Sequence, residues 1–253
     1  MSGLEVKLRG ALEAVADCSA LLAGAWTGLT AADLARRPVS IAGRGPVALG
    51  ELAGVSGEPD GTVRFVGDWR QAARLGAGLT GGRVAIEGDA GDEIGLAMAG
   101  GSIEVRGNAG ERAGAAAPEA RRGMTGGELV VHGSVGREAG ALMRRGLLVA
   151  GGTVGDHAAA GMIAGTLVAF GAVGPAPGLW SKRGSVVALG ELPVPSTYRY
   201  ACTYQPVHLR LLLSRLQARY ALPVEGRHLS GFYRRYSGDL AELGKGEILA
   251  WTA

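Results

Sequence analysis

The fold is decided by the stretch Leu148-Val-Ala-Gly-Gly152-Thr-Val-Gly155-Asp-His-Ala-Ala-Ala-Gly-Met162-Ile-Ala-Gly-Thr-Leu167-Val-Ala-Phe-Gly171-Ala-Val-Gly174, which contains one motif twice. In each copy a short apolar run ends at a glycine, and another glycine follows three residues later. The copies are 19 residues apart, since 171 − 152 = 19. A motif that returns at a fixed period of about 20 residues is typical of a solenoid.

The same register extends in both directions from this stretch. We name the glycine that ends each apolar run the anchor glycine; the anchors are Gly67, Gly88, Gly107, Gly133, Gly152, Gly171 and Gly190. Their separations are 21, 19, 26, 19, 19 and 19 residues. The single step of 26 is 19 plus seven, and an insertion around Ala116 to Arg122 supplies the seven. The repeat therefore covers most of the middle of the chain.

Each repeat begins with a pattern typical of a β-strand. Apolar residues stand four and two positions before each anchor, as Ile103 and Val105 do before Gly107. This alternation directs both side chains to one side of a strand. A strand, two glycine bends and a return in 19 residues describe one coil of a parallel β-helix, with coils stacked roughly 4.7–4.9 Å apart. We expect apolar residues two positions after each anchor, and Met98, Met143 and Met162, to fill the interior.

The sequence thus predicts a mainly β protein: a right-handed parallel β-helix of about seven coils of about 19 residues, with small extensions at both ends. We expect an α/β N-terminal cap over residues 1–54, the β-helix over 55–193 and a helical C-terminal extension over 194–253. The cap begins with a strand at Leu4–Arg9 and holds a helix capped by Thr30. An amphipathic helix is predicted over Pro206–Arg219, because an apolar stripe recurs there at helical spacing. The stripe is Leu209, Leu212, Leu213, Leu216 and Tyr220.

Composition excludes several classes of protein. Glycine contributes 45 of 253 residues, but 47 % of residues are hydrophobic, which argues against a disordered Gly-rich chain. The net charge of +3 comes without a long basic run, so no nucleic-acid partner is expected. Two cysteines without a C-x-x-C motif favour neither a disulfide framework nor structural zinc. No window of 18 apolar residues exists, so we expect no membrane association and a cytoplasmic protein.

The sequence offers little catalytic chemistry. The histidines His132, His157, His208 and His228 are scattered, and no H-E-x-x-H or G-x-S-x-G motif occurs. We interpret His132 as an exposed strand residue and the pair Asp92–Glu93 as a solvated corner. No catalytic, cofactor-binding or metal-binding residue is therefore assigned in this chain.

One face of the predicted strands changes character along the solenoid. The outward positions are polar in the early coils and apolar in the late ones, and soluble monomers avoid large exposed apolar patches. Either the C-terminal segment or another protein must cover the late face. The candidate subunit interface consists of Val149, Val168, Phe170, Val187 and Leu189.

Basic residues also recur in register. Arg144–Arg145 and Lys182–Arg183 stand eleven and twelve positions after their anchors, two coils apart. Stacking places the two pairs roughly 9–10 Å from each other on one edge, and Arg121 and Arg122 of the insertion lie near it. Arginine forks bind carboxylates bidentately, so this edge is a candidate contact for an anionic carrier or an acidic partner. A solvated corner is the alternative.

The 19-residue repeat with G-x-x-G-x-x-x-G corners resembles the GXGXG β-helix shared by the C subunit of formylmethanofuran dehydrogenase and the C-terminal domain of the glutamate synthase large chain. The flanks resemble the dehydrogenase C subunit. They are the opening Leu4–Arg9 strand, Leu29-Thr-Ala-Ala-Asp-Leu, Gly43-Arg-Gly-Pro-Val-Ala-Leu-Gly50, Tyr204-Gln-Pro-Val-His-Leu-Arg-Leu-Leu-Leu213 and Gly238-Asp-Leu-Ala-Glu-Leu-Gly-Lys-Gly-Glu-Ile-Leu249. The seven-residue insertion is the main departure from the family pattern.

The resemblance implies a non-catalytic scaffolding subunit, most like the C subunit of the bacterial formyltransferase/hydrolase complex, in tetrahydromethanopterin-linked oxidation of formaldehyde to formate. It implies hydrolase, formyltransferase and dehydrogenase-B-like subunits as partners. A metal (zinc, or molybdenum or tungsten pterin in the dehydrogenase version) and a methanofuran-type carrier are implied in those partners. The carrier's glutamate-rich tail would be an anionic partner for the basic edge.

Three alternatives remain open at the level of sequence. The chain could be the C subunit of a molybdenum or tungsten formylmethanofuran dehydrogenase. It could be a glutamate synthase-like β-helix that braces amidotransferase and synthase domains. It could also be an independent ligand-binding solenoid, which a stable monomer without partners would favour.

Overall fold

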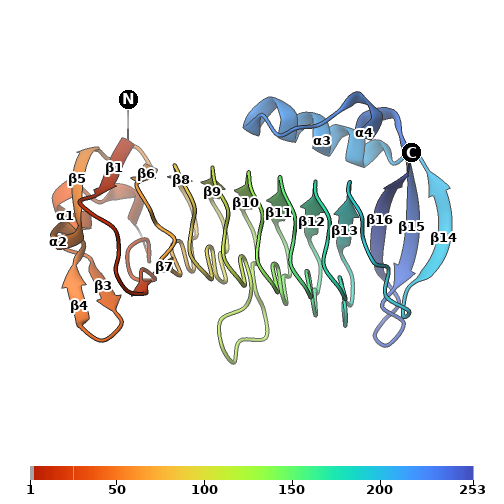
Figure 1. Cartoon of the computed structure of the whole chain (residues 1–253), viewed down its shortest axis with the longest axis horizontal. Helices are drawn as coiled ribbons and strands as arrows, with labels where there is room; N and C mark the ends of the chain where they lie inside the picture. The colour runs from red at the N-terminus through yellow and green to blue at the C-terminus, as the bar shows by residue number, and fades with distance from the viewer. Residues whose placement is uncertain (1–2, 25, 253) are drawn as a thin grey trace.

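The chain folds into one long sheet and one small sheet. The computed structural model describes residues 3–24 and 26–252. Within these residues the long sheet has twelve strands in the order β14-β15-β16-β13-β12-β11-β10-β9-β8-β6-β1-β5, and the small sheet has the order β4-β3-β2-β7. Figure 1 shows the strands of the long sheet side by side, with helices α1 and α2 at one end and α3 lying over the other half.

The strands of the long sheet are β1 (Gly3–Leu8), β5 (Ala53–Glu58), β6 (Thr62–Val66), β8 (Arg83–Ile86), β9 (Ser102–Val105), β10 (Glu128–Val131), β11 (Leu147–Ala150), β12 (Thr166–Ala169), β13 (Ser185–Ala188), β14 (Arg199–Tyr204), β15 (Phe232–Gly238) and β16 (Gly246–Thr252). The small sheet contains β2 (Ala16–Asp17), β3 (Pro38–Ile41), β4 (Gly45–Ala48) and β7 (Ala72–Ala73). The helices are a short 3-10 turn (Trp26–Gly28), α1 (Ala31–Ala35), α2 (Leu49–Leu52), α3 (Val207–Tyr220) and α4 (Gly226–Ser230).

The repeating units form parallel strands whose pairing follows the glycine register. From β8 to β13, each strand residue pairs with the residue one repeat further along the chain. Val105 pairs with Val131, which pairs with Ala150, and all three side chains are fully buried. This ladder confirms the predicted repeat across the insertion. The protein is mainly β, with a large, mostly parallel sheet of β-helix-like form; the right-handed sense and the coil count stay predictions.

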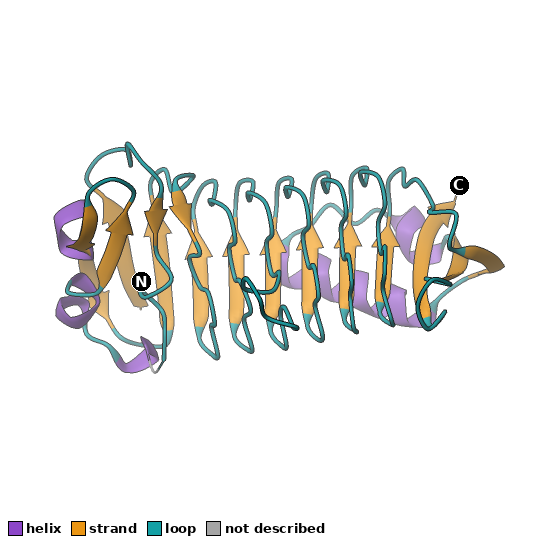
Figure 2. Cartoon of the chain, turned by 90° about the horizontal axis from the view of Figure 1, so that it is seen from below, coloured by secondary structure: helices purple, strands orange, loops and turns teal. Residues whose placement is uncertain are grey.

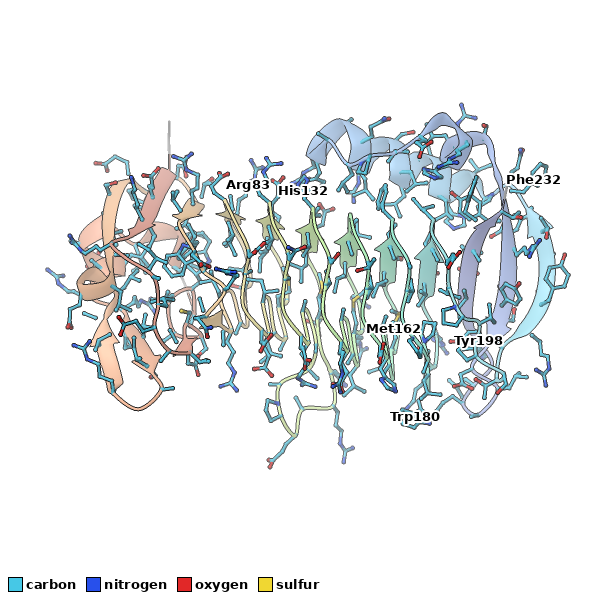
Figure 3. The ribbon with its side chains drawn as sticks, in the orientation of Figure 1. Arg83, His132, Met162, Trp180, Tyr198 and Phe232 are labelled. Carbon is cyan, nitrogen blue, oxygen red and sulfur yellow. The ribbon has the colours of Figure 1, made fainter. Side chains whose placement is uncertain are left out.

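The interior is filled as the alternation predicts. Residues two positions after the anchors line up in parallel bridges that join Ala90, Ala109, Val135, Val154 and Val173, and all five are buried. The three methionines of the repeat are buried as well, and Figure 3 shows Met162 beneath the ribbon of the late coils. The interior of the coils is therefore one continuous apolar column.

Two different demands explain the glycines of the repeat. At Gly171 an added Cβ would lie 2.7 Å from the carbonyl carbon of Gly152 in the preceding coil, so the close approach of coils excludes any side chain. Gly146, at the bend before β11, has a φ of +102°, which L-residues with a side chain rarely adopt. Figure 2 shows the resulting bends aligned along both edges of the solenoid.

Both chain ends add strands to the solenoid. β1, the predicted opening strand, pairs in parallel with β6 and antiparallel with β5. Helix α1 carries the predicted cap, because the Thr30 side chain accepts from the Asp33 N–H while Asp33 accepts from the Thr30 N–H. The strand at the other end was not predicted from the sequence. After α3 and α4, β16 returns to pair in parallel with β13. No helix among the described residues is long and apolar enough to span a membrane.

Candidate functional site

The four predicted basic residues of the solenoid edge meet around one pocket. Arg144 and Arg145 precede β11, and Lys182 and Arg183 precede β13. We name this the basic pocket; its volume is about 290 Å3, and Ile163 and Ala164 of the intervening coil line it together with Leu243. Its other lining residues are Arg144, Arg145, Lys182 and Arg183. The structure therefore brings together the complete set that register predicted.

Hydrogen bonds between coils hold the backbone of the basic pocket. The Arg144 N–H donates to the Met124 carbonyl at 2.8 Å, and the Lys182 N–H donates to the Met162 carbonyl at 2.8 Å. The four cationic side chains form no ion pair with any residue in the described ranges. Their charges are therefore available to a ligand or partner, at a position that the backbone fixes.

Leu243 is the part of the basic pocket that sequence reasoning missed. It lies in the turn between β15 and β16 and is 54 % exposed. No periodicity connects it to the repeat, because its position depends on the return of β16 beside β13. The pocket thus combines cations with one apolar wall.

The C-terminal segment covers the late apolar face. Val149, Val168 and Val187 are fully buried in a cluster with Leu213 and Tyr233. The remaining members of this cluster include Val130, Leu147, Leu189, Leu209, Leu216, Tyr220, Leu222, Val224 and Leu249, with Phe170 partly buried against it. These side chains pack inside the chain rather than at a subunit interface, because α3 lies over them and Tyr233 of β15 joins the same cluster. The sequence left open whether the C-terminal segment or another protein covers this face. In the structure the C-terminal segment covers it.

A ladder of ion pairs follows one corner of the early coils. Glu93 lies between Arg74, at 2.6 Å, and Arg112, at 3.1 Å, and Arg112 also contacts Glu138 at 2.7 Å. The Glu93 side chain is only 14 % exposed, so the interpretation of a solvated corner is wrong for this residue. Burial by itself would raise the pKa of Glu93, but hydrogen bonds and charges of the two arginines outweigh it and lower the pKa. The ladder ties successive coils together.

A cluster of charged and hydrogen-bonded side chains connects α3 to the long sheet. Glu128 of β10 accepts from the Tyr220 hydroxyl at 2.7 Å and pairs with Arg215 at 2.7 Å and Arg219 at 3.6 Å. Burial would raise the pKa of Glu128, yet the Tyr220 hydrogen bond and the two guanidinium groups prevail and hold it below its ordinary value of 4.5. Burial and the Glu128 carboxylate together raise the pKa of Tyr220 to about 12. These contacts hold the C-terminal end of α3 against β10.

We expect Glu128→Gln to lower the stability of the chain more at pH 7 than at pH 3. A carboxylate whose pKa is lower in the folded state stabilises fully above about pH 4.5 and loses that contribution as pH falls through the folded pKa. Urea unfolding at pH 7 and pH 3 measures the difference. Glu87→Gln, at an exposed strand end, is the matched control and should have no effect at either pH. A constant difference between wild type and Glu128→Gln across this range would contradict the assignment.

His132 is less exposed than the alternation suggests. Its Nε2 lies 2.9 Å from the Glu104 carboxylate and 3.2 Å from the Arg106 guanidinium, and its side chain is 19 % exposed. Figure 3 shows it on the long sheet, close to the end of α3. A polar hollow of about 540 Å3 lies beside Glu128 and Arg219, and sequence reasoning missed it. Its lining residues are Asp60, Gly61, Thr62, Gly82, Arg83, Gly101, Ser102, Glu128 and Arg219.

The side chains that could bind a metal ion do not cluster in the described parts of the chain. No group of three His, Cys, Asp or Glu side chains there is arranged to hold a metal ion. Several acidic and imidazole groups that could serve as ligands are engaged in pairs within the chain, as Glu93, Glu128 and His132 illustrate.

Comparisons with known proteins add the family. No family model matches the sequence, and no curated protein matches it. Among solved structures, a chain of the formyltransferase/hydrolase complex FhcABCD from Methylorubrum extorquens, crystallised with methylofuran, is 31 % identical. The match covers 98 % of this chain and 100 % of that chain, with a TM-score of 0.80. This confirms the resemblance drawn from the glycine repeat and the flanks. The chain belongs to the same family as this member of the formyltransferase/hydrolase complex.

Proposed function

We propose that the chain is the β-helical C subunit of a cytoplasmic formyltransferase/hydrolase complex, and that it acts as a scaffold rather than as a catalyst. The observation that carries this proposal is the full-length similarity to one chain of such a complex. The use of its buried and half-buried carboxylates in pairs that join coils or anchor α3 supports a structural role. Hydrolase, formyltransferase and dehydrogenase-B-like subunits are the proposed partners in the oxidation of formaldehyde to formate.

An activity measurement separates a scaffold from a catalytic subunit. Formate release from a formylated tetrahydromethanopterin donor is measured with the purified chain, with the other subunits, and with the full set. A scaffold predicts no formate from the chain alone and a faster rate, with a higher yield of assembled complex, from the full set. Formate release by the chain alone would overturn the non-catalytic role. Molybdenum- or tungsten-dependent oxidation of the formyl group by the full set would favour the dehydrogenase alternative.

We further propose that the basic pocket binds the anionic tail of the methanofuran-type carrier. The related complex was crystallised with methylofuran. The fit rests on Arg144, Arg145, Lys182 and Arg183, whose side chains form no ion pair with a described residue and surround a pocket of about 290 Å3. When bound in the assembled complex, the carrier would accept the formyl group in the partner subunits, where the metal is also proposed to lie. The role of this chain is to hold the tail.

Replacing Arg144 and Arg145 with alanine is expected to raise the KM of the complex for the carrier on the order of tenfold at low salt. Exposed charge contacts contribute up to about 1 kcal/mol each, and about 1.4 kcal/mol is tenfold. The effect should shrink as salt rises, because exposed charges are screened. The double variant Lys7→Ala/Arg9→Ala at the other end of the chain removes the same charge and should leave KM unchanged.

A carrier without the glutamate tail distinguishes tail binding from assembly. If the arginines bind the tail, the double variant and the wild-type complex should have the same KM for the tailless carrier. Equal losses with both carriers would show that the pocket holds another subunit instead. Unchanged kinetics with both carriers would leave the pocket as a solvated corner.

A further inference from the structure

The two ends of the long sheet differ in how their edge strands are protected. Helices α1 and α2 pack against the edge strand β5. At the other end, β14 has β15 as its only strand neighbour in the described chain. Five of the six residues of β14 are exposed, and Figure 1 shows no element beyond it. An edge strand without cover presents free N–H and C=O groups to another polypeptide.

Most of the exposed large apolar side chains belong to the late coils and the C-terminal segment, on several of their sides. Eight large hydrophobic residues of the described chain are exposed, and seven of them fall between residues 180 and 243. The seven are Trp180, Tyr200, Val207, Leu211, Phe232, Leu240 and Leu243. Figure 3 shows Trp180 and Phe232 pointing away from the late coils and the last strands. The remaining residue, Val15, lies in the N-terminal part. Soluble proteins concentrate such surface where a partner binds.

Next to the open edge lies an aromatic and cationic face. Alternation along β15 places Phe232, Arg234 and Tyr236 on one side, and Tyr236 stacks edge-on with Tyr200 of β14, with ring centroids 6.0 Å apart. Neither Arg234 nor Arg199 of β14 forms an ion pair with a described residue. The surface beside the free backbone edge is therefore both apolar and positively charged.

We propose that β14 is the docking strand for another subunit of the complex, which adds an extended segment to this edge. Main-chain hydrogen bonds to β14 would supply affinity, and side chains at alternate positions would supply specificity. The segment carries apolar side chains that pack on Tyr200 and Phe232 and carboxylates that face Arg199 and Arg234. This inference rests on the proposed function in one respect, that the chain assembles with other subunits.

Charge favours a different chain over a second copy as the occupant. Arg199 lies on β14 itself and Arg234 lies on the neighbouring strand β15. Pairing of two identical edges would bring Arg199 and Arg234 of both copies to one interface without matching carboxylates. Like charges across an interface disfavour association, whereas an acidic segment is attracted.

Proline substitutions in β14 test the proposal on the intact complex. Consecutive strand residues direct their N–H groups to opposite edges, and proline removes the donor. Of Cys202→Pro and Thr203→Pro, one loses a bond to β15 and melts at a lower temperature, while the other loses an outward donor and keeps its Tm. The variant with unchanged Tm is the probe of docking. Tyr200→Asp, at a side chain that is 59 % exposed, tests the same surface independently of the backbone.

Each variant is co-expressed with the other subunits, and the bound subunits are quantified after purification through a tag on this chain. We expect the probe variant and Tyr200→Asp to bind at least one subunit at least tenfold more weakly, while Val15→Asp at the other end has no effect. Wild-type stoichiometry in both variants overturns the inference and leaves the proposed function intact. A dimer of the isolated chain that the probe variant abolishes also overturns it, since the occupant is then a second copy. Failure of the wild type to bind any subunit overturns both proposals.

Discussion

Leu213→Asp is expected to detach α3 from the solenoid and to cause one of the largest losses of stability in the chain. Leu213 is fully buried and packs in one cluster with Val149, Val168 and Val187. Truncation of such a residue to alanine costs about 2–5 kcal/mol, and an unpaired buried carboxylate adds several kcal/mol more. Urea unfolding of the isolated chain measures the loss as a lower midpoint.

Leu211 supplies the matched control for this experiment. It lies on the same helix but is 68 % exposed. Leu211→Asp should therefore change the free energy of unfolding by no more than about 0.5 kcal/mol. Equal midpoints for Leu213→Asp and wild type would contradict the covering of the late apolar face by α3.

Gly171→Ala is expected to destabilise the solenoid by about 3 kcal/mol although it adds a single methyl group. The added carbon would lie 2.7 Å from the carbonyl carbon of Gly152 and 2.9 Å from the Thr153 nitrogen. Both atoms belong to the backbone of the preceding coil, to which the Gly171 N–H donates at 2.9 Å. The coils cannot separate without loss of these hydrogen bonds, so no inexpensive relaxation exists.

Gly10→Ala is the control for Gly171→Ala. An added Cβ at Gly10 meets no atom within 4 Å. Alanine there should leave stability unchanged or raise it slightly, because it restricts the unfolded chain. Thermal unfolding of both variants makes the comparison. Similar melting temperatures would show that contact between coils does not determine the anchor glycines.

The repeat made most of the fold predictable from sequence. A period of 19 residues and apolar alternation suffice to place Val105, Val131 and Ala150 in one ladder, because parallel coils impose the same offset on every pair. The cap of α1 was predictable as well, since Thr30 and Asp33 interact over three residues. Local and periodic relations are visible in one dimension.

Single, long-range contacts were not predictable in this way. The pairing of β16 with β13 joins residues about 60 positions apart, and no repeat in the sequence indicates it. The same holds for Leu243 in the basic pocket and for Glu128 beneath Tyr220. Glu93 is a different case: Arg74 and Arg112 stand one repeat before and after it, so the period alone would have placed them beside Glu93, and the interpretation as solvated overlooked this register.

The candidate site was predictable in part for the same reason. Arg144 and Lys182 share a register position, so stacking brings them to one edge. The interface assignment of Val149, Val168 and Val187 failed because alternation shows that a face is apolar and not what covers it. The apolar stripe of α3 is the surface that packs on this face. Pairing the two apolar surfaces would have predicted the C-terminal segment as the cover.

The most direct test of the central claim is the identity of the subunits that co-purify with this chain. The tagged chain is purified from its native host at low salt, and the bound proteins are identified and counted by native mass spectrometry. Our account predicts hydrolase and formyltransferase subunits in a fixed ratio with the chain. A monomer without partners, or an assembly with glutamate synthase domains, would contradict it.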